Sequence, residues 1–210
     1  MKELVLIGGG GHCHSCIDVI ESRGEYRIRG IVDSRLSRLD KVLAYPVLGD
    51  DDDLGELLKE SPNTLITVGH IKSPDVRIRL FEQAKLLGAS FPVVCASTAY
   101  ISRHADVSEG TVIMHGAFVN ANTSISQNTI VNSAALVEHD CEIGAHCHIS
   151  TGVRINGGVR IGAGCFIGSG VIIREGLNIA ASSIIAAGSV LLSDCDTPGT
   201  YIGSPASLRS

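Results

Sequence analysis

The chain has 210 residues, of which 44% are hydrophobic, 19% are charged and only 4% are aromatic, and its formal net charge is −5. This hydrophobic fraction excludes global disorder, and an acidic chain without clustered Lys and Arg does not resemble a nucleic-acid-binding module. No apolar run approaches the ~20 residues that a membrane helix needs. We therefore expect one or two globular domains that bind neither nucleic acid nor a membrane.

The cysteines and the N-terminus bear on the cellular compartment. The seven cysteines are scattered and odd in number, which is typical of reduced thiols rather than of a disulfide framework. The first apolar run, residues 4–7, ends at a glycine and is too short for a signal-peptide core. Both features predict a cytoplasmic protein. The His/Cys clusters near Cys13 and Cys147 lack the usual zinc spacing, so no metal is expected.

Residues 1–95 alternate short apolar runs with stretches of helical period. The predicted strands are 4–7, 27–32, 64–68 and 91–94, and the predicted helices are 15–23, 53–60 and 74–87. Asp53 is a candidate N-cap for the second helix. Strands that alternate with helices suggest a parallel sheet. We therefore predict a small, three-layer, Rossmann-like α/β domain.

A strict hexapeptide period begins after this domain. From Ile101 to Leu191 a branched aliphatic residue occupies every sixth position, and the residue two positions earlier is mostly small. Such a period predicts a three-sided prism in which each hexapeptide forms one face and three hexapeptides form one coil. We predict a parallel β-helix of about five coils over residues 96–195, followed by a C-terminal tail at 196–210.

His139 is the strongest catalytic candidate. It is flanked by Glu138 and Asp140. A neutral imidazole can accept a proton near pH 7, and an adjacent carboxylate can fix its tautomer and stabilise the imidazolium. These groups suit the attack of an amine or alcohol on a thioester carbonyl. An exposed surface histidine is the alternative interpretation.

A glycine run suggests a phosphate-binding loop. Gly8, Gly9, Gly10 and Gly11 follow a predicted strand and open a predicted helix, a context in which free backbone N–H groups bind phosphate. The run does not match G-x-G-x-x-G, which argues against a nicotinamide cofactor.

These motifs together resemble one family. They are the hexapeptide series, the Gly-Gly-Gly-Gly-His loop, the segment Asn132…Glu138-His139-Asp140 and the terminal Gly203-Ser204-Pro205-Ala206. The combination resembles the left-handed β-helix acyltransferases, and within them the bacterial nucleotide-sugar acetyltransferases and the related sialic-acid O-acetyltransferases. The resemblance covers essentially the whole chain. It implies that residues 1–95 bind a nucleotide sugar, that residues 96–195 hold acetyl-CoA and the catalytic groups, and that the protein is a homotrimer with active sites between subunits.

The resemblance also implies roles for single residues around the acyl donor. His139 would be the general base and Asp140 its orienting acid, with Glu138 as the second choice. The residues implied near acetyl-CoA are His148, Gly157, Gly203 and Pro205. The Gly157 N–H would stabilise the oxyanion. A solvated surface histidine for His148 and a plain turn for Gly157 remain open.

On the nucleotide-sugar side, the resemblance implies contacts from the glycine loop, with His12 beside the diphosphate. The other residues implied at this site are Asp33, Gly69 and Asn132. One position departs from the family pattern, because Ser207 stands where a lysine usually lies near the CoA phosphates. Arg209 is a candidate substitute.

We therefore expect an acetyl-CoA-dependent acetyltransferase of polysaccharide biosynthesis. It would acetylate the amine of a nucleotide-linked 4-amino-deoxy sugar by direct attack, with His139 as general base. Two alternatives remain. One is O-acetylation of sialic acid or a related nonulosonate, and the other is a non-catalytic β-helix that binds a nucleotide sugar.

Overall fold

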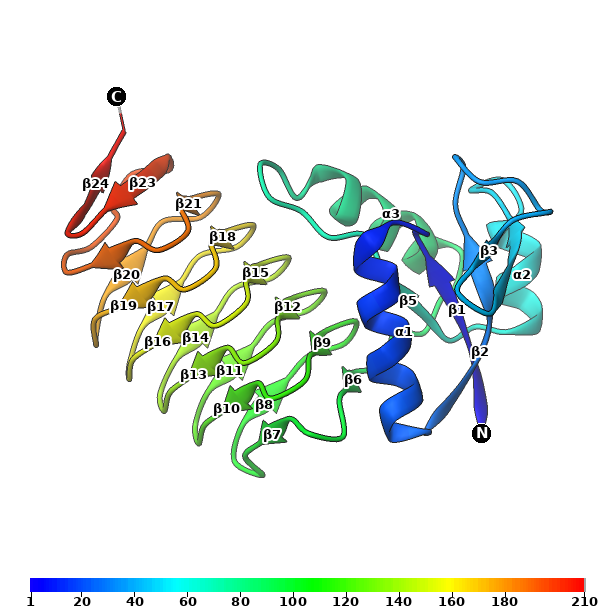
Figure 1. The fold of residues 1–210 in the computed structure, drawn as a ribbon, viewed down its shortest axis with the longest axis horizontal. Coiled ribbons are helices and arrows are strands. Elements are labelled where there is room, and N and C mark those ends of the chain that lie inside the picture. Colours follow the sequence, from blue (N-terminus) through cyan, green and yellow to red (C-terminus); the bar gives the residue numbers. More distant parts are fainter. Residues whose placement is uncertain (210) are drawn as a thin grey trace.

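The computed structural model describes residues 1–209 and places an α/β domain at one end of a long β-helix (Figure 1). The elements of the α/β domain are β1 (Lys2–Ile7), α1 (Gly11–Arg23), β2 (Tyr26–Val32), β3 (Lys41–Val42), β4 (Tyr45–Gly49), α2 (Leu54–Glu60), β5 (Thr64–Ile66) and α3 (Asp75–Leu86). The sheet order is β3-β4-β2-β1-β5. All pairs are parallel except the β3–β4 hairpin, which confirms the predicted parallel sheet.

One element was missed and three local predictions need correction. The β3–β4 hairpin was not predicted, and α1 begins at Gly11 rather than at residue 15. The strand expected at 91–94 is β6 (Val94–Cys95), which pairs with the β-helix and not with the N-terminal sheet. Asp53 precedes α2 but makes no side-chain capping bond. Its carboxylate instead accepts from Arg38 at 2.6 Å and from the Asp50 N–H at 3.0 Å.

The β-helix has three flat faces, which we name by their character. The junction face, which packs on the N-terminal domain, consists of β6, β9 (Val112–Ile113), β12 (Ile130–Val131), β15 (His148–Ile149), β18 (Phe166–Ile167), β21 (Ile184–Ile185), β23 (Thr200–Gly203) and β24 (Ala206–Leu208). The apolar face consists of β7 (Tyr100–Ile101), β10 (Phe118–Val119), β13 (Leu136–Val137), β16 (Arg154–Ile155), β19 (Ile172–Ile173) and β22 (Val190–Leu191). The polar face consists of β8 (Asp106–Val107), β11 (Ser124–Ile125), β14 (Glu142–Ile143), β17 (Arg160–Ile161) and β20 (Asn178–Ile179).

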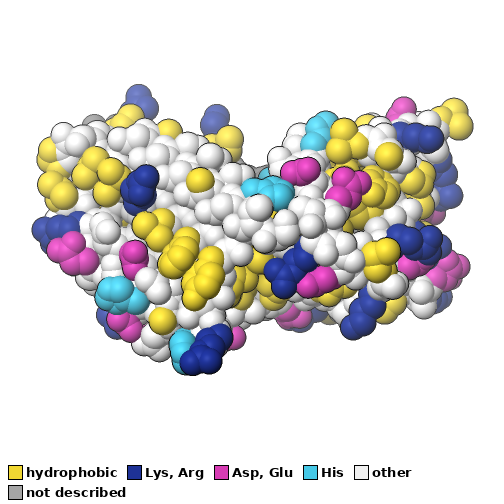
Figure 2. All heavy atoms as spheres, turned by 60° about the horizontal axis from the view of Figure 1, so that its bottom comes forward, with side chains coloured by type: hydrophobic (Ala, Val, Ile, Leu, Met, Phe, Trp, Pro, Cys, Tyr) yellow, Lys and Arg dark blue, Asp and Glu magenta, His cyan; other side chains and the backbone are white. Residues whose placement is uncertain are grey.

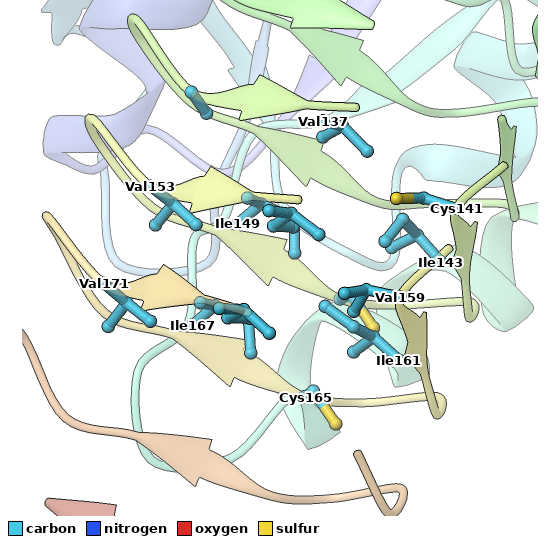
Figure 3. Packing of buried hydrophobic residues seen from close by; sticks show 14 of the residues in the cluster. Val137, Cys141, Ile143, Ile149, Val153, Val159, Ile161, Cys165, Ile167 and Val171 are labelled. Carbon is cyan, nitrogen blue, oxygen red and sulfur yellow. The ribbon is translucent and has the colours of Figure 1, made fainter. Parts of the chain in front are cut away.

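The hexapeptide period produces this prism because each two-residue strand pairs with the strand one coil further on. Leu136 of β13 pairs with Phe118 of β10 below and with Arg154 of β16 above. The second residue of each strand points inward, so the aliphatics stack in columns (Figure 3). Burying each such side chain contributes about 1.5–3 kcal/mol. Cys141, Cys147 and Cys165, which occupy predicted small inward positions, are fully buried, and all seven cysteines are free thiols.

The two domains share a packed junction. Ile17 of α1 lies in one hydrophobic cluster with Val112 and Ile130 of the junction face. Arg77 of α3 is fully buried and donates to the carbonyls of Ile66 at 2.6 Å, Val68 at 2.9 Å and Asn128 at 3.1 Å. These bonds tie the N-terminal sheet to a corner of the β-helix. No helix within residues 1–209 has the length and apolarity that a membrane crossing requires.

Candidate active site

His139 and Asp140 form a hydrogen-bonded pair at the corner between β13 and β14. His139 Nδ1–H donates to Asp140 Oδ2 at 2.7 Å, and both side chains are exposed. Asp140 adopts a left-handed backbone conformation with φ of 61°, which a hexapeptide corner requires. Because Nδ1 carries the hydrogen, Nε2 of the neutral ring is left as a proton acceptor. The hydrogen bond and charge of Asp140 raise the pKa of His139, which makes the imidazole a stronger base.

Asp140 and Glu138 each accept a hydrogen bond from a different asparagine of the coil below. Asn122 Nδ2–H donates to Asp140 Oδ1 at 2.6 Å, and Asn120 Nδ2–H donates to Glu138 Oε2 at 2.6 Å. The bond from Asn122, together with that from His139, lowers the pKa of Asp140. The structure therefore brings Asp140, rather than Glu138, into hydrogen-bond contact with the imidazole. The sequence interpretation missed both asparagines, although each lies one coil before its carboxylate and the hexapeptide period already indicated that vertical neighbour.

Gly157 lies directly against the His139 ring from the coil above. A Cβ atom on Gly157 would come within 2.6 Å of His139 Cε1, so any side chain at this position would push the imidazole aside. The neighbouring Gly158 N–H donates to the His139 carbonyl at 2.9 Å. The Gly157 N–H itself has no hydrogen-bond partner among the described residues. The arrangement leaves one free N–H beside a histidine base.

The glycine run connects β1 to α1 as predicted. Gly8 has φ of +108°, and a Cβ there would meet Val68 Cγ2 at 2.3 Å, so the tight turn requires glycine. Gly10 is the residue before the helix and Gly11 its first residue, without a side-chain cap. The first N–H groups of a helix lack intrahelical partners and attract anions. The loop therefore offers an anion-binding helix end.

Asp33 anchors this loop from the end of β2. Its carboxylate accepts from the Gly9 N–H at 2.7 Å, from the Arg35 N–H at 2.8 Å and from the Arg35 guanidinium at 3.1 and 3.3 Å. Burial would raise the pKa of Asp33, but the bonds from Arg35 and Gly9 together hold it below its usual value. Both carboxylate oxygens are thus engaged within the chain.

Three histidines gather where the domains meet. His148 Nδ1–H donates to the His70 carbonyl at 2.8 Å, and Asn132 Nδ2–H donates to His148 Nε2 at 3.2 Å. The ring centroids of His12 and His148 lie 6.1 Å apart. Burial, followed by nearby positive charge, lowers the pKa of His12 to about 3 and of His70 to about 4, and burial also lowers that of His148 to about 4. All three imidazoles are therefore neutral near pH 7.

This cluster lines two adjoining hollows. One, of about 520 Å³, includes Gly10, Gly11, His12, Gly69 and His148. The other, of about 400 Å³, includes Asp33, Gly69 and His70. His148 is only 7% exposed, so the interpretation as a solvated surface histidine is wrong. The structure places it with Asn132 and the glycine loop, among the residues expected to contact the nucleotide sugar.

Within one chain the two groups of candidate residues lie on different sides of the prism. His139 stands at the corner between the apolar and polar faces, opposite the junction face that carries His148. Gly203 and Pro205 belong to the β23–β24 hairpin at the far end of the β-helix (Figure 1). Ser207 pairs with Ile202 in the same hairpin. In the part of the chain that the structure describes, no group of three or more His, Cys, Asp or Glu side chains is placed to hold a metal ion.

Comparison with known proteins adds three findings. The family model described as the PglD N-terminal domain matches residues 3–84. A histidine variant of perosamine N-acetyltransferase from Caulobacter crescentus, solved with CoA and GDP-perosamine, is 31% identical, with a TM-score of 0.94 over 100% of this chain and 98% of that chain. The acetyltransferase domain of PglB from Neisseria gonorrhoeae is 31% identical, with a TM-score of 0.92 over all of both chains.

A curated relative gives a partial match. UDP-N-acetylbacillosamine N-acetyltransferase from Bacillus subtilis is 29% identical over 114 residues, which are 54% of this chain. The matched segment spans about half, 52%, of that relative's length. The Neisseria domain has also been solved with acetyl coenzyme A, and that structure is 30% identical over 99% of both chains.

Proposed function

The chain belongs to the nucleotide-amino-sugar acetyltransferases of the left-handed β-helix, hexapeptide-repeat superfamily, and from this premise we propose that it transfers the acetyl group of acetyl-CoA to the amine of a nucleotide-linked 4-amino-deoxy sugar. The single observation that carries the proposal is the hydrogen-bonded His139–Asp140 pair beside the free Gly157 N–H. A positioned base next to an oxyanion donor is the arrangement that acyl transfer needs.

The proposed reaction is a direct transfer. As the sugar amine attacks the thioester carbonyl carbon, His139 Nε2 takes the amine proton and Asp140 stabilises the imidazolium that forms. The Gly157 N–H donates to the oxyanion of the tetrahedral intermediate. When the C–S bond breaks, the imidazolium returns its proton to the departing CoA thiolate. A cysteine acyl-enzyme is not part of the proposal, because Cys141, Cys147 and Cys165 are fully buried.

We also propose that the active site forms between copies in a homotrimer. His139 lies at the corner opposite the junction face, so the nucleotide-sugar hollow that it serves would belong to a neighbouring copy. The apolar face supports such a contact. Tyr100 and Phe118 stack there with ring centroids 4.7 Å apart and are 52% and 37% exposed. Ile172 of the same face is 40% exposed, and hydrophobic side chains are visible on both halves of the space-filling view (Figure 2).

The first test is CoA release from acetyl-CoA with UDP-, GDP- and dTDP-linked 4-amino sugars beside free and CMP-linked sialic acid. The native chain should turn over an amino-sugar nucleotide, and His139→Ala should reduce kcat at least ~10²-fold, the low end for loss of a general base. His104→Ala, at an exposed position on the same corner two coils below Asp140, is the matched control. Turnover with the sialic acids alone would replace the proposal by O-acetylation, and near-normal activity of His139→Ala would refute the mechanism.

A further inference from the structure

Arg35 is an exposed side chain whose guanidinium is nevertheless held in place. It follows β2 by three residues and its side chain is 75% exposed. Asp33 accepts from its Nε at 3.3 Å and from its Nη2 at 3.1 Å. Exposed arginines usually lose rotamer freedom when they bind a ligand, and this two-point fork removes part of that cost in advance. Nη1 has no hydrogen-bond partner within residues 1–209.

The position of Arg35 joins the two hollows. The residues that line both are Arg35, Val68, Gly69 and His70. Val68 and Gly69 carry no charge, and the lowered pKa of His70, about 4, keeps its ring neutral. Arg35 is therefore the cation shared by the two hollows, at the place where a ligand that fills both would pass from one to the other.

The N-terminus of α1 faces the same place. Arg35 Nη2 lies 3.9 Å from where a Cβ on Gly10 would stand. The helix has 13 residues, no acidic residue in its first turn and no side-chain cap. Its first N–H groups and the guanidinium thus present positive charge from two sides of a narrow gap. Between them an anion would receive donors from both the backbone and Arg35.

Two buried side chains that line the hollow of about 400 Å³ have polar atoms without hydrogen-bond partners in residues 1–209. His70 is 7% exposed, and neither of its ring nitrogens is bonded to any described residue. Arg77 is fully buried, its three hydrogen bonds go to carbonyl oxygens, and its Nη2 has no partner in residues 1–209. Buried polar groups without partners are rare in native proteins and point to a missing ligand or solvent. These groups are independent of the helix end and favour a ligand rich in acceptor oxygens.

We propose that Arg35 binds the diphosphate of the nucleotide sugar against the N-terminus of α1, and that Asp33 is the positioning residue that holds its guanidinium there. The proposal rests on the proposed function and changes the role of Asp33, whose oxygens are engaged by Gly9 and Arg35 and not free for a base or ribose. The nucleoside then occupies the hollow of about 400 Å³. The sugar occupies the hollow of about 520 Å³ beside His12 and His148.

The test is calorimetric titration of the full-length chain with UDP, GDP and dTDP, and with the corresponding nucleosides. Arg35→Ala should weaken the Kd of the preferred nucleoside diphosphate about 10- to 100-fold, the range for losing a charge-assisted hydrogen bond. Its Kd for the nucleoside should change much less, because Arg35 only borders that hollow, and its Kd for acetyl-CoA should stay unchanged. Arg35→Lys keeps the charge but not the two-point hydrogen bonding, so its Kd for the nucleoside diphosphate should lie between those of the native chain and Arg35→Ala. The matched control is Arg38→Ala, which removes an exposed arginine of the same loop that pairs with Asp53.

Asp33→Asn tests the positioning role. It should weaken diphosphate binding much more than nucleoside binding, whereas a merely collapsed loop would weaken both equally. Equal diphosphate affinity in Arg35→Ala and the native chain would overturn the inference while the proposed function stands. If the native chain binds no nucleoside diphosphate yet acetylates sialic acid, the proposed function fails and the inference with it.

Discussion

Histidines occur in two opposite settings in this molecule. At the β13–β14 corner His139 is exposed and bonded to a carboxylate, which raises its pKa. At the domain junction, burial and the charge of nearby Arg77 lower the pKa values of His12, His70 and His148. The first setting favours taking up a proton, and the second keeps an uncharged ring that only donates or accepts hydrogen bonds. The comparison separates a site of proton transfer from a site of ligand binding, although both use the same residue type.

The largest loss of activity should come from a substitution at Gly157, which packs against the exposed His139 ring. Gly157→Ala would place a methyl group within 2.6 Å of His139 Cε1 and push the ring away from the reacting atoms. We expect kcat to fall ~10²-fold or more, because misplacing a catalytic group by about 1 Å costs this much. Thermal unfolding should hardly change, since the His139 side chain is 61% exposed and free to move.

The matched control for that variant is Gly55→Ala in α2, where the nearest atom to a new Cβ lies 3.8 Å away. It should keep native activity. A fully active Gly157→Ala would contradict the close packing of glycine and imidazole as a requirement of catalysis.

Removing the charge of Asp140 should have a smaller effect. Asp140 raises the pKa of His139, so Asp140→Asn should lower it. The acid limb of the kcat/KM profile, where the base becomes protonated, should then move to lower pH, while the plateau falls roughly 10-fold because the imidazolium loses its stabilising charge. Glu138→Gln is the matched control, because Glu138 is bonded to Asn120 and not to the imidazole. A larger shift of the acid limb in the control would assign the orienting role to Glu138.

Asn122, one coil below, should affect catalysis through its hydrogen bond to Asp140. Asn122→Leu removes the 2.6 Å hydrogen bond to Asp140 Oδ1. It should reduce kcat by about 3- to 10-fold without changing the KM for acetyl-CoA, since a hydrogen bond to an ionised group contributes about 1.5–3 kcal/mol and only part of this reaches the imidazole through Asp140. Asn122→Asp should move the acid limb to higher pH, because a second carboxylate favours the imidazolium. An unchanged pH profile in Asn122→Asp would exclude a link through Asp140.

Protonation of the three buried histidines should lower the stability of the fold. The unfolded chain binds protons at its histidines as the pH falls through about 6.5, whereas the folded chain does so only near pH 3–4. The contribution of these histidines to the free energy of unfolding should therefore be at its maximum above pH 6.5 and fall as the pH drops toward 4. Thermal scans at pH 7.5 and 5.0 should show a Tm lower by several degrees at the acid pH. His70→Leu should reduce that difference, and the exposed His104→Leu should not.

Much of the fold followed from the sequence because the hexapeptide rule is local and repeated. The inward aliphatics, the buried Cys147 and the pairing of His139 with its neighbour Asp140 all follow from positions close in the chain. What the sequence did not indicate depends on contacts between distant segments. β6 joins the β-helix because Val94 pairs with Val112, and His148 is buried because the loop carrying His70 covers it. The glycine run concealed the true start of α1, since glycine is a poor helix former.

The coil spacing that places Asn122, Asp140 and Gly158 on neighbouring coils also governs which changes of length the chain can accept. An insertion of one complete coil beyond Gly158 would lengthen the prism by about 4.8 Å, one strand spacing, and leave each later residue on its original face. An insertion of a single hexapeptide would instead carry every later residue to the next face. Length variation among relatives of this chain should therefore occur in whole coils between the His139 corner and the C-terminal hairpin. Other insertions should be confined to loops that project from the prism and keep the columns of inward aliphatics intact.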